Sequence, residues 1–371
     1  MNTLQTRFGS GQEVQRLEDD ALLAGRGQFT DDIEHAGQTR LCFVRSPHPH
    51  ARITSIDTAA AATMPGVRLV LTGAELQAAG VKVMAKPIMH KRADGGRPAS
   101  PDRHLLAVER VRFVGECVVA VVADTEQQAR DAAEAVQVNY EPLPHAVTLA
   151  DALAPNAPLL SDAPDNKVAE SRHGDAAQAQ AAFARARHVV ELDITNQRVV
   201  ALSIEPRSVQ AHIDQGRLVV RMSSQMPTGI RTQICDLLGL KESQVRVLVG
   251  DVGGGFGMKT GAYPEDILVA YCAHRLQRPV KWIAERAEEF LSSSHGRDIH
   301  CHGALALDEH GKILALRIHT LANVGAYPGM TGVTIQIMIG PWVQTSVYDI
   351  GCIDFHYTAV MTHTASTGAY R

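Results

Sequence analysis

The sequence predicts a mixed α/β fold, because short runs with strand-like alternation recur along the chain and helical segments lie between them. Two regions show this pattern, one before and one after a proline-rich stretch near residues 144–164. The chain has 371 residues, which is enough for two or three domains of ordinary size. Apolar residues make up 45% and charged residues 20%, a balance that predicts buried cores rather than a disordered chain.

The first region is predicted to form one compact mixed α/β domain of roughly 120 residues, within the usual domain range. A helix is expected over residues 126–136, because Thr125 can cap it and alanines recur at helical spacing. Alternating apolar residues bounded by glycine and proline predict the strands of this region. These strands are expected at 41–45, 51–56, 67–71, 112–116, 118–122 and 136–140.

The stretch 146–172 is predicted to be an extended connector rather than a packed element, because proline, alanine, asparagine and aspartate are frequent in it. The region that follows repeats the mixed pattern of helices and strands. Helices are expected at 174–186, 228–238 and 264–276. Strands are expected at 188–194, 209–213, 217–222, 245–249, 279–283 and 353–361, with a hairpin over 304–318.

The most informative motif is Asp251-Val-Gly-Gly-Gly-Phe-Gly-Met-Lys259, which follows the expected strand 245–249. Glycine is used where φ is positive or where the main chain approaches a ligand closely. Exposed N–H groups in such a loop form a concavity for phosphate or another anion. The spacing fits neither the dinucleotide-binding fingerprint nor the phosphate loop of nucleoside triphosphatases. The loop therefore predicts a cofactor contact, and the alternative is a tight strand–helix turn that binds nothing.

Composition and charge exclude several classes of protein. The net charge of −4 gives no basic field for nucleic acid. No apolar run approaches the roughly 20 residues that a membrane helix needs, so no membrane span is expected. The six cysteines form no Cys-x-x-Cys pair, which argues against iron–sulfur or zinc ligation inside this chain. Residues 1–11 show no export signal, so a cytoplasmic location is expected.

A series of short motifs along the chain resembles one known family. The motifs lie at 16–20, 43–48, 51–53, 112–116, 205–207, 224–227, 253–259, 278–282, 295–297, 325–327 and 368–371. Together they resemble the large, molybdenum-cofactor-binding subunit of the xanthine dehydrogenase, aldehyde oxidase and aerobic carbon monoxide dehydrogenase family. The resemblance implies an a/b hammerhead domain at 18–145, after a leading segment at 1–17. It also implies that 173–371, beyond the connector, form the first part of a molybdopterin-binding domain.

The resemblance further implies roles for individual residues. Gln225 would place its side-chain amide beside an oxo group on molybdenum, where an amide can donate without adding charge. Arg371 would approach the cofactor with its fixed fork of donors, which suits anionic groups. Backbone groups of the glycine loop would lie against molybdopterin, at Gly254, Gly255, Phe256 and Gly257. The cytosine dinucleotide form of the cofactor is one candidate, and no side chain is expected to ligate the metal.

Simpler roles stay open for the same residues. Gln225 is also compatible with an ordinary capping or turn residue before Pro227. Arg371 is also compatible with a frayed chain end. The tripeptide Glu205-Pro-Arg207 is expected to be structural, as an ion pair or a turn near the site.

The family's chemistry is hydroxylation at a carbon by an oxygen derived from water, with electrons passed to iron–sulfur clusters. The resemblance therefore implies a small aldehyde, heteroaromatic or related substrate, an iron–sulfur partner subunit and an FAD subunit. The family's catalytic base, a glutamate near the C-terminal end of full-length members, has no counterpart here. The chain is thus expected to be the first half of a longer protein, or to be completed by a second chain. Two alternatives stay open: a truncated non-catalytic module, and a nucleotide-binding protein that uses the 253–257 loop.

Overall fold

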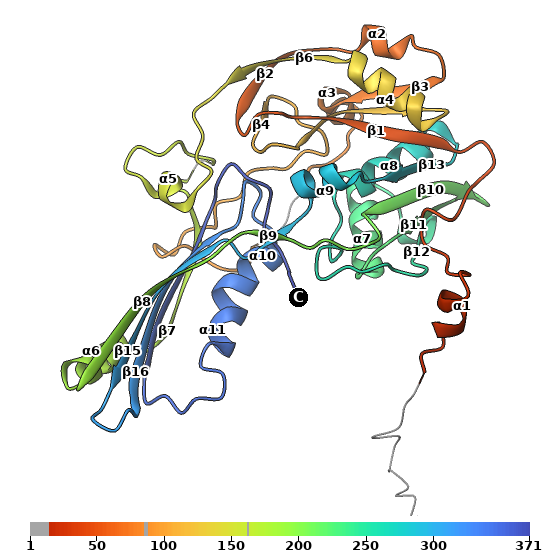
Figure 1. Ribbon diagram of the computed structural model, residues 1–371. Coiled ribbons are helices and arrows are strands. Elements are labelled where there is room, and N and C mark those ends of the chain that lie inside the picture. Colours follow the sequence, from red (N-terminus) through yellow and green to blue (C-terminus); the bar gives the residue numbers. More distant parts are fainter. Residues whose placement is uncertain (1–14, 85–87, 162) are drawn as a thin grey trace, which may run out of the picture.

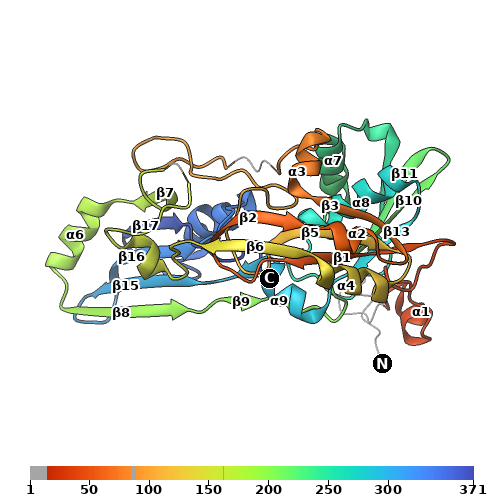
Figure 2. The ribbon, with the colours of Figure 1, turned by 90° about the horizontal axis from the view of Figure 1, so that it is seen from above.

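The computed structural model describes residues 15–84, 88–161 and 163–371, and it confirms the mixed α/β fold (Figure 1). Figures 1 and 2 show a compact body from which a five-stranded sheet projects as an arm, with helix α6 (Ala176–Ala184) at the tip of the arm. The predicted leading segment 1–17 lies mostly outside the described residues, and α1 (Asp19–Leu23) follows it. No helix in the described ranges has the length and apolar composition that crossing a bilayer requires.

The body contains a seven-stranded sheet that draws strands from both regions of the sequence. Its order is β12 (Val245–Leu248), β11 (Arg217–Met222), β10 (Ser208–Asp214), β13 (Val280–Ile283), β1 (Thr39–Arg45), β5 (Cys117–Ala123) and β3 (Val67–Thr72). The two regions join where β1 pairs in parallel with β13. Phe43 of β1 packs edge-on against Trp282 of β13, with ring centroids 5.7 Å apart, so one core serves both regions.

Among the described residues, three long helices pack on this sheet at positions predicted from the sequence, and two short helices, which were not predicted, pack there too. They are α2 (Ala59–Ala62), α3 (Gly73–Ala78), α4 (Glu126–Ala135), α7 (Pro227–Leu238) and α8 (Pro264–Leu276). Thr125 and Gln128 form a reciprocal capping box at the start of α4. Gly239 ends α7 with φ of +68°, the left-handed conformation that favours glycine after a helix. The three long helices predicted from the sequence in this body are confirmed.

A three-stranded sheet lies beside the body, in the order β4 (Arg110–Val111), β2 (Ala51–Asp57) and β6 (Gln137–Pro142). The predicted strand at 112–116 is wrong, because β4 ends at Val111 and a turn follows. Gly115 in this turn has φ of +98°, which a strand does not allow. A Cβ there would meet Leu291 at 2.7 Å, so the turn also needs glycine for a close approach.

The arm is a five-stranded sheet in the order β7 (Lys167–Gly174), β17 (Ile353–Val360), β16 (Ile313–Asn323), β15 (Ile299–Leu307) and β8 (His188–Asn196). The predicted hairpin is confirmed as the antiparallel pair of β15 and β16. Helix α6 contributes to a core cluster with β15 and β16. A second core cluster of the arm includes Val333 of α10 (Met330–Thr334) and Ile337 of η3 (Ile335–Ile339), and α11 (Gly340–Val343) follows η3.

The predicted connector 146–172 is not an unpacked segment. It contains α5 (Leu149–Leu153), which Thr148 caps, and most of β7. Ala152 and Val168 are buried in these two elements. Proline is frequent in this stretch, but the prolines lie between α5 and β7 rather than inside them. Composition therefore predicted the breaks correctly and missed the short elements that the breaks separate.

The remaining elements connect the arm to the body. Strand β9 (Val199–Val200) pairs with β14 (His295–Gly296), and α9 (Arg286–Ser292) precedes β14. The last residues of the chain run alongside, because His295 forms a parallel bridge with Thr367. This junction borders the glycine loop.

Candidate functional site

The glycine loop leaves β12 and turns sharply before α8. Gly254, Phe256 and Gly257 have φ of +103°, +49° and +94°. An aromatic residue at positive φ is strained by about 1–3 kcal/mol, so the surrounding contacts must hold it there. Within the part of the chain that the structure describes, the N–H groups of Gly254, Gly255 and Phe256 donate to no acceptor. Three successive amides without an acceptor on one turn are an arrangement that can bind an anion.

Gln225 holds the loop in this shape. Its side-chain Oε1 accepts hydrogen bonds from the backbone nitrogens of Gly257 at 3.0 Å and Lys259 at 3.3 Å. A Cβ at Gly255 would lie 2.5 Å from the same oxygen, so the loop approaches Gln225 as closely as it can. The two donors fix which side-chain atom is the oxygen, and the Nε2 amide donates to no acceptor among the described residues. The side chain of Gln225 is exposed.

A buried ion pair holds the two ends of the loop. The Nζ atom of Lys259 lies 3.3 Å from Oε2 of Glu205 and donates to Ser223 Oγ at 2.8 Å. The same Oε2 atom accepts from the backbone nitrogen of Gly253 at 2.8 Å. Burial lowers the pKa of the Lys259 ammonium, and the neighbouring Glu205 carboxylate opposes this effect. One carboxylate thus contacts the first residue of the loop and the last.

The end of the chain lies along the outer side of the loop. The backbone nitrogen of Arg371 donates to the carbonyl of Phe256 at 2.9 Å. A Cβ at Gly257 would lie 2.5 Å from the carbonyl of Ala369, which requires glycine at this contact. The structure therefore brings Gln225, the loop and Arg371 together. The side chains of Phe256 and Arg371 are both exposed at this point.

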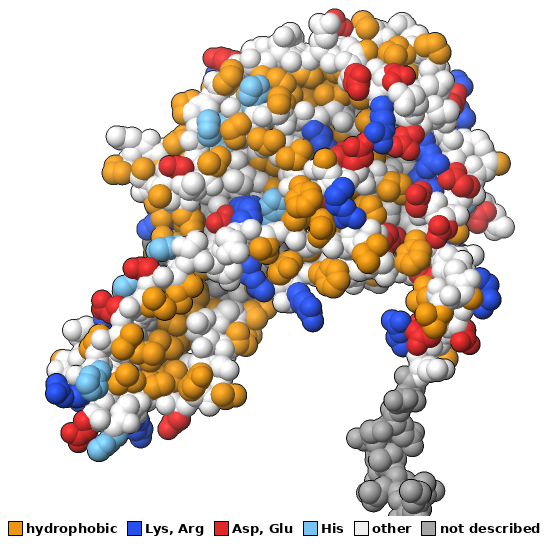
Figure 3. Space-filling model, in the orientation of Figure 1, with side chains coloured by type: hydrophobic (Ala, Val, Ile, Leu, Met, Phe, Trp, Pro, Cys, Tyr) orange, Lys and Arg blue, Asp and Glu red, His pale blue; other side chains and the backbone are white. Residues whose placement is uncertain are grey.

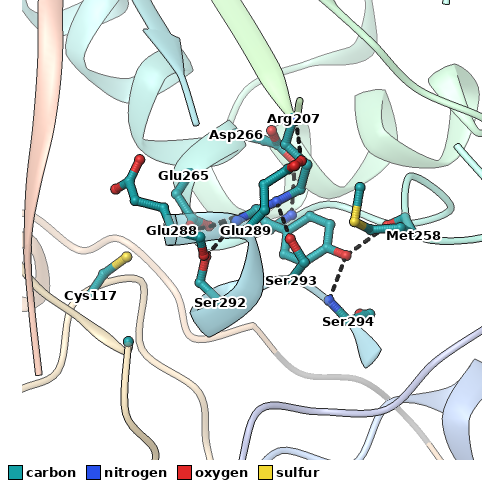
Figure 4. Close-up of polar contacts among 12 residues, drawn as sticks. Cys117, Arg207, Met258, Glu265, Asp266, Glu288, Glu289, Ser292, Ser293 and Ser294 are labelled. Atoms are coloured by element: carbon teal, nitrogen blue, oxygen red, sulfur yellow. Dashed lines mark hydrogen bonds and ion pairs between the residues drawn. The ribbon is translucent and has the colours of Figure 1, made fainter. Parts of the chain in front are cut away.

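Behind the loop, Tyr263 connects it to the interior. Its hydroxyl donates to the carbonyl of Met258 at 2.7 Å and accepts from the backbone nitrogen of Ser294 at 3.0 Å (Figure 4). The guanidinium of Arg207 lies over the Tyr263 ring, 4.1 Å from its centroid. A cation over an aromatic face is attracted by the ring. The loop therefore rests on a rigid buried support.

Arg207 belongs to a buried charge cluster that Figure 4 shows. It donates to Ser292 at 2.7 Å and Ser293 at 2.9 Å, and it lies 3.4 Å from Glu265. Arg45 of β1 contacts the same carboxylate at 3.0 Å. Burial alone would raise the pKa of Glu265, but Arg207 and Arg45 lower it to about 2. The carboxylate is thus ionised and ties the two regions of the sequence together.

Glu205 and Arg207 do not pair with each other, although the sequence allowed an ion pair between them. Glu205 contacts Lys259 in the glycine loop, and Arg207 contacts Glu265 of α8. No sequence pattern predicts the structural roles of Lys259 and Tyr263. The partner of Lys259 lies 54 residues away along the chain, so spacing alone carried no signal for the pair. The only signal in the sequence is that Glu205 and Lys259 each lie inside a short motif, at 205–207 and 253–259.

Comparison with known proteins places both regions of the chain. Residues 24–144 match the aldehyde oxidase and xanthine dehydrogenase a/b hammerhead domain. Residues 159–371 match the molybdopterin cofactor-binding domain.

Relatives and solved structures agree with these matches. The chain is 35% identical to the nicotine 6-hydroxylase large subunit of Paenarthrobacter nicotinovorans, over 99% of this chain and 44% of that subunit. It is 35% identical to the carbon monoxide dehydrogenase large chain of Afipia carboxidovorans, over 98% of this chain and 46% of the relative. The crystal structure of quinoline 2-oxidoreductase from Pseudomonas putida 86 superposes with a TM-score of 0.88 at 34% identity, over 97% of this chain and 45% of that one.

The chain spans a little under half the length of these relatives. The two matched domains follow in the order that the motifs predicted, and the glycine loop and Gln225 lie within the second one. The chain belongs to the xanthine dehydrogenase, aldehyde oxidase and carbon monoxide dehydrogenase family of molybdopterin-binding large subunits.

Proposed function

We propose that this chain is the first part of the large subunit of a molybdenum hydroxylase, and that the glycine loop and Gln225 hold its molybdopterin. Two features of the glycine loop support this proposal most: its amides without an acceptor and the neighbouring Gln225 amide. Three consecutive amides, at Gly254, Gly255 and Phe256, have no acceptor among the described residues. The Gln225 carbonyl is already occupied by the loop, which leaves its amide nitrogen as a donor.

These donors fit molybdopterin. The cofactor carries a phosphate group, and successive backbone amides at a turn bind such anions without a charged side chain. The Gln225 amide adds a neutral donor next to them. When bound, molybdopterin supplies the molybdenum chemistry that oxidises a carbon with oxygen taken from water. The residues of this chain orient the group, and the buried Lys259–Glu205 pair keeps the loop rigid while they do so.

The substrate, partners and location belong to the same proposal. The substrate is a small aldehyde, heteroaromatic or related compound, and the relatives include one named for nicotine and one for carbon monoxide. The relatives are large subunits or chains of complexes, which supports an iron–sulfur subunit and an FAD subunit as partners. We also propose that the cofactor is in its cytosine dinucleotide form and that a chain or segment supplies the C-terminal half. The proposed location is the cytoplasm.

Molybdenum content tests the proposal. The tagged chain is co-expressed with the rest of the large subunit and the small subunits, and molybdenum is measured by mass spectrometry together with extracted pterin. Wild type and the control Gln178→Glu, on the exposed start of α6, should carry molybdenum near one per complex. Gln225→Glu should carry several-fold less, because it replaces the amide donor with a negative charge. An equal molybdenum content in Gln225→Glu and wild type would show that Gln225 does not help to bind the cofactor. Absence of molybdenum from every sample would favour a non-catalytic module.

The same free amides also suit the phosphate of a free nucleotide, which is the competing hypothesis. Calorimetry of the chain with ATP, NAD and cytidine nucleotides separates the two. Binding of a free nucleotide in the absence of molybdenum and pterin would favour a nucleotide-binding protein. We expect no such binding, because the loop lacks the spacing of either nucleotide fingerprint.

A further inference from the structure

A small cavity borders the glycine loop and the end of the chain. Its volume is about 50 Å³, and Met258 and Ala369 lie in its wall. A Cβ at Gly257 would lie 2.5 Å from the Ala369 carbonyl, so the cavity adjoins the contact between the loop and the chain end. A single water needs roughly 10–15 Å³ of cavity volume. The cavity therefore has room for a group of a few heavy atoms.

Hydroxyl groups line much of this cavity. They belong to Thr260, Ser294, Thr331 and Thr367. The hydroxyls of Thr260 and Thr367 donate to backbone carbonyls, at 2.7 Å and 2.9 Å. Within the described ranges, the hydroxyls of Ser294 and Thr331 have no hydrogen-bond partner. Two neutral donors are therefore available to a group in the cavity.

Arg103 is the only charged residue among the described residues that line the cavity. The residue is half-buried, and its side chain has neither an ion pair nor a hydrogen bond within the described part of the chain. A guanidinium presents five N–H donors in a fixed fork. Partial burial of such a cation without an acceptor costs free energy. Arg103 thus lacks the partner that a half-buried cation normally has.

Two aromatic rings hold the guanidinium of Arg103 in place. Its Cζ atom lies 5.2 Å from the centroid of the Tyr327 ring and 5.9 Å from that of Phe113. A ring attracts a cation over its face, and this contact uses none of the N–H donors. Arg112 contacts the same Tyr327 ring at 5.7 Å, but it also donates to the Tyr327 hydroxyl at 3.3 Å. The rings therefore position Arg103 without giving it an acceptor.

The carboxyl group of Glu116 lies near Arg103 and does not act as its partner. Its two oxygens accept hydrogen bonds from the Tyr327 hydroxyl and from the backbone nitrogen of Arg112. Burial raises the pKa of Glu116, and the hydrogen bond from Tyr327 and the charge of Arg103 oppose this effect. No ion pair joins Glu116 to Arg103 in the described ranges. The charge of Arg103 is therefore available to a group in the cavity.

Arginines on the surface of the body have a different environment. Figure 3 shows basic and acidic side chains interspersed over the body. Arg40, Arg68 and Arg130, for example, each pair with a carboxylate. The position of Arg103, beside hydroxyl groups and away from any carboxylate in the cavity wall, is thus not that of an ordinary surface arginine.

We propose that Arg103 determines substrate specificity by binding a carboxylate on the substrate, with the hydroxyls of Ser294 and Thr331 as further donors. The arginine fork matches the two oxygens of a carboxylate and binds both at once. The substrate is then a small aldehyde or heteroaromatic compound that carries a carboxylate. This inference deepens the proposed function and rests on it, because the cavity borders the loop to which that proposal assigns the cofactor.

Binding of matched ligands to the assembled complex tests the role of Arg103. The ligands are pairs of a carboxylate and its carboxamide, built on benzene, pyridine and quinoline, and titrations followed by saturation-transfer NMR give their affinities. Within at least one pair, wild type should bind the carboxylate at least tenfold more tightly than the amide. Arg103→Met should abolish this preference and change amide affinity less than twofold. Arg103→Lys should retain part of the preference, because it keeps the charge and loses the fork.

Two control variants accompany these measurements. Arg112→Met removes a cation from the same Tyr327 ring, but Arg112 does not line the cavity. Arg52→Met removes an exposed arginine that pairs with Glu141. Both controls should keep the ratio of the two affinities within twofold of wild type. A similar loss of preference in Arg112→Met and Arg103→Met would show that a general loss of positive charge, and not the cavity, causes it.

Turnover gives a second measurement for any carboxylate that the complex oxidises. Arg103→Met should raise its KM at least tenfold and leave kcat within about twofold, because the contact is made to a part of the substrate that does not react. Two results would overturn the inference. They are equal affinity for carboxylate and amide in every wild-type pair, and equal loss of both ligands in Arg103→Met.

Molybdenum measured in the same preparations keeps this inference apart from the proposed function. A carboxylate preference that depends on Arg103 in samples without molybdenum would retain the anion site and refute the function. Full molybdenum content without any carboxylate preference would retain the function and refute the role of Arg103.

Discussion

The side-chain oxygen of Gln225 lies 3.0 Å from the backbone nitrogen of Gly257 and 3.3 Å from that of Lys259. One neutral side chain thus satisfies two amides of the glycine loop and fixes the direction of its own amide nitrogen. The arrangement separates two roles of the residue. The oxygen supports the loop, and the nitrogen is available to a bound group.

Substitutions at Gln225 should separate these roles in stability. Gln225→Ala leaves two backbone amides without their acceptor and should lower the free energy of unfolding by about 1–2 kcal/mol. Gln225→Glu keeps an acceptor at the same position, so its free energy of unfolding should fall by less than about 0.5 kcal/mol. Urea denaturation of the isolated chain measures both. Equal losses for the two variants would show that the oxygen contact does not support the loop.

Glycine at position 257 should be required by a contact as well as by backbone conformation. Gly257→Ala places a Cβ 2.5 Å from the Ala369 carbonyl at φ of +94° and should cost about 2–4 kcal/mol. Gly216→Ala is the matched control, because Gly216 has φ of +76° and no atom within 4 Å of such a Cβ. Its cost should be about 1 kcal/mol. Equal melting temperatures for the two variants would refute the close approach of the chain end to the loop.

Much of the fold follows from local pattern. Capping at Thr125 and the glycine after α7 mark helices that the structure confirms. The prediction of an extended connector at 146–172 was wrong. Proline frequency indicates where helices and strands break, but a capped five-residue helix and a strand can form from the few residues between the breaks. The strand at 112–116 was wrong because its apolar residues belong to a turn that Gly115 allows.

The candidate site also has one part that the sequence predicts and one part that it does not. The loop is visible in the sequence because glycine marks unusual backbone wherever it clusters. The contacts that support the loop are not visible in the sequence, since Lys259 contacts Glu205 across 54 residues and the Tyr263 ring packs against Arg207 in a distant segment. The pairing of charges across a core depends on the tertiary fold. Sequence spacing therefore predicts the loop and leaves the groups that hold it unassigned.

The buried pair of Lys259 and Glu205 should be strongly coupled. Lys259→Met removes the ammonium and leaves the Glu205 carboxylate without its charge partner, which should cost about 3–5 kcal/mol. Glu205→Gln leaves the buried Lys259 ammonium without its charge partner, and the free energy of unfolding should fall by a similar amount. A double-mutant cycle should give a coupling of about 1–3 kcal/mol. The exposed pair Arg52 and Glu141 is the control, with coupling below about 1 kcal/mol. Matching couplings in both cycles would contradict a special role for the buried pair.

His363 should make stability fall in acid. Its ring is buried against His50, with centroids 4.3 Å apart, and its Nδ1 atom accepts from the backbone nitrogen of Ala146 at 3.1 Å. Burial lowers the pKa of His363 from 6.5 to about 3. The unfolded chain therefore binds the proton first, so this contribution is complete above pH 6.5 and is lost as the pH falls toward 3.

The slope in that window should be up to about 1.4 kcal/mol per pH unit from this residue. Urea denaturation at pH 7, 6 and 5 should show a smaller decline for His363→Gln than for wild type. The exposed His310→Gln should follow wild type. Parallel curves for wild type and His363→Gln would mean that His363 is not buried in its neutral form.

The most direct test of the central claim is a cryo-electron microscopy map of the assembled complex purified through this chain. Density for the pterin should lie within hydrogen-bond distance of the Gly254–Phe256 amides and of Nε2 of Gln225. A map in which other residues occupy those amides, with the pterin elsewhere or absent, would contradict the account.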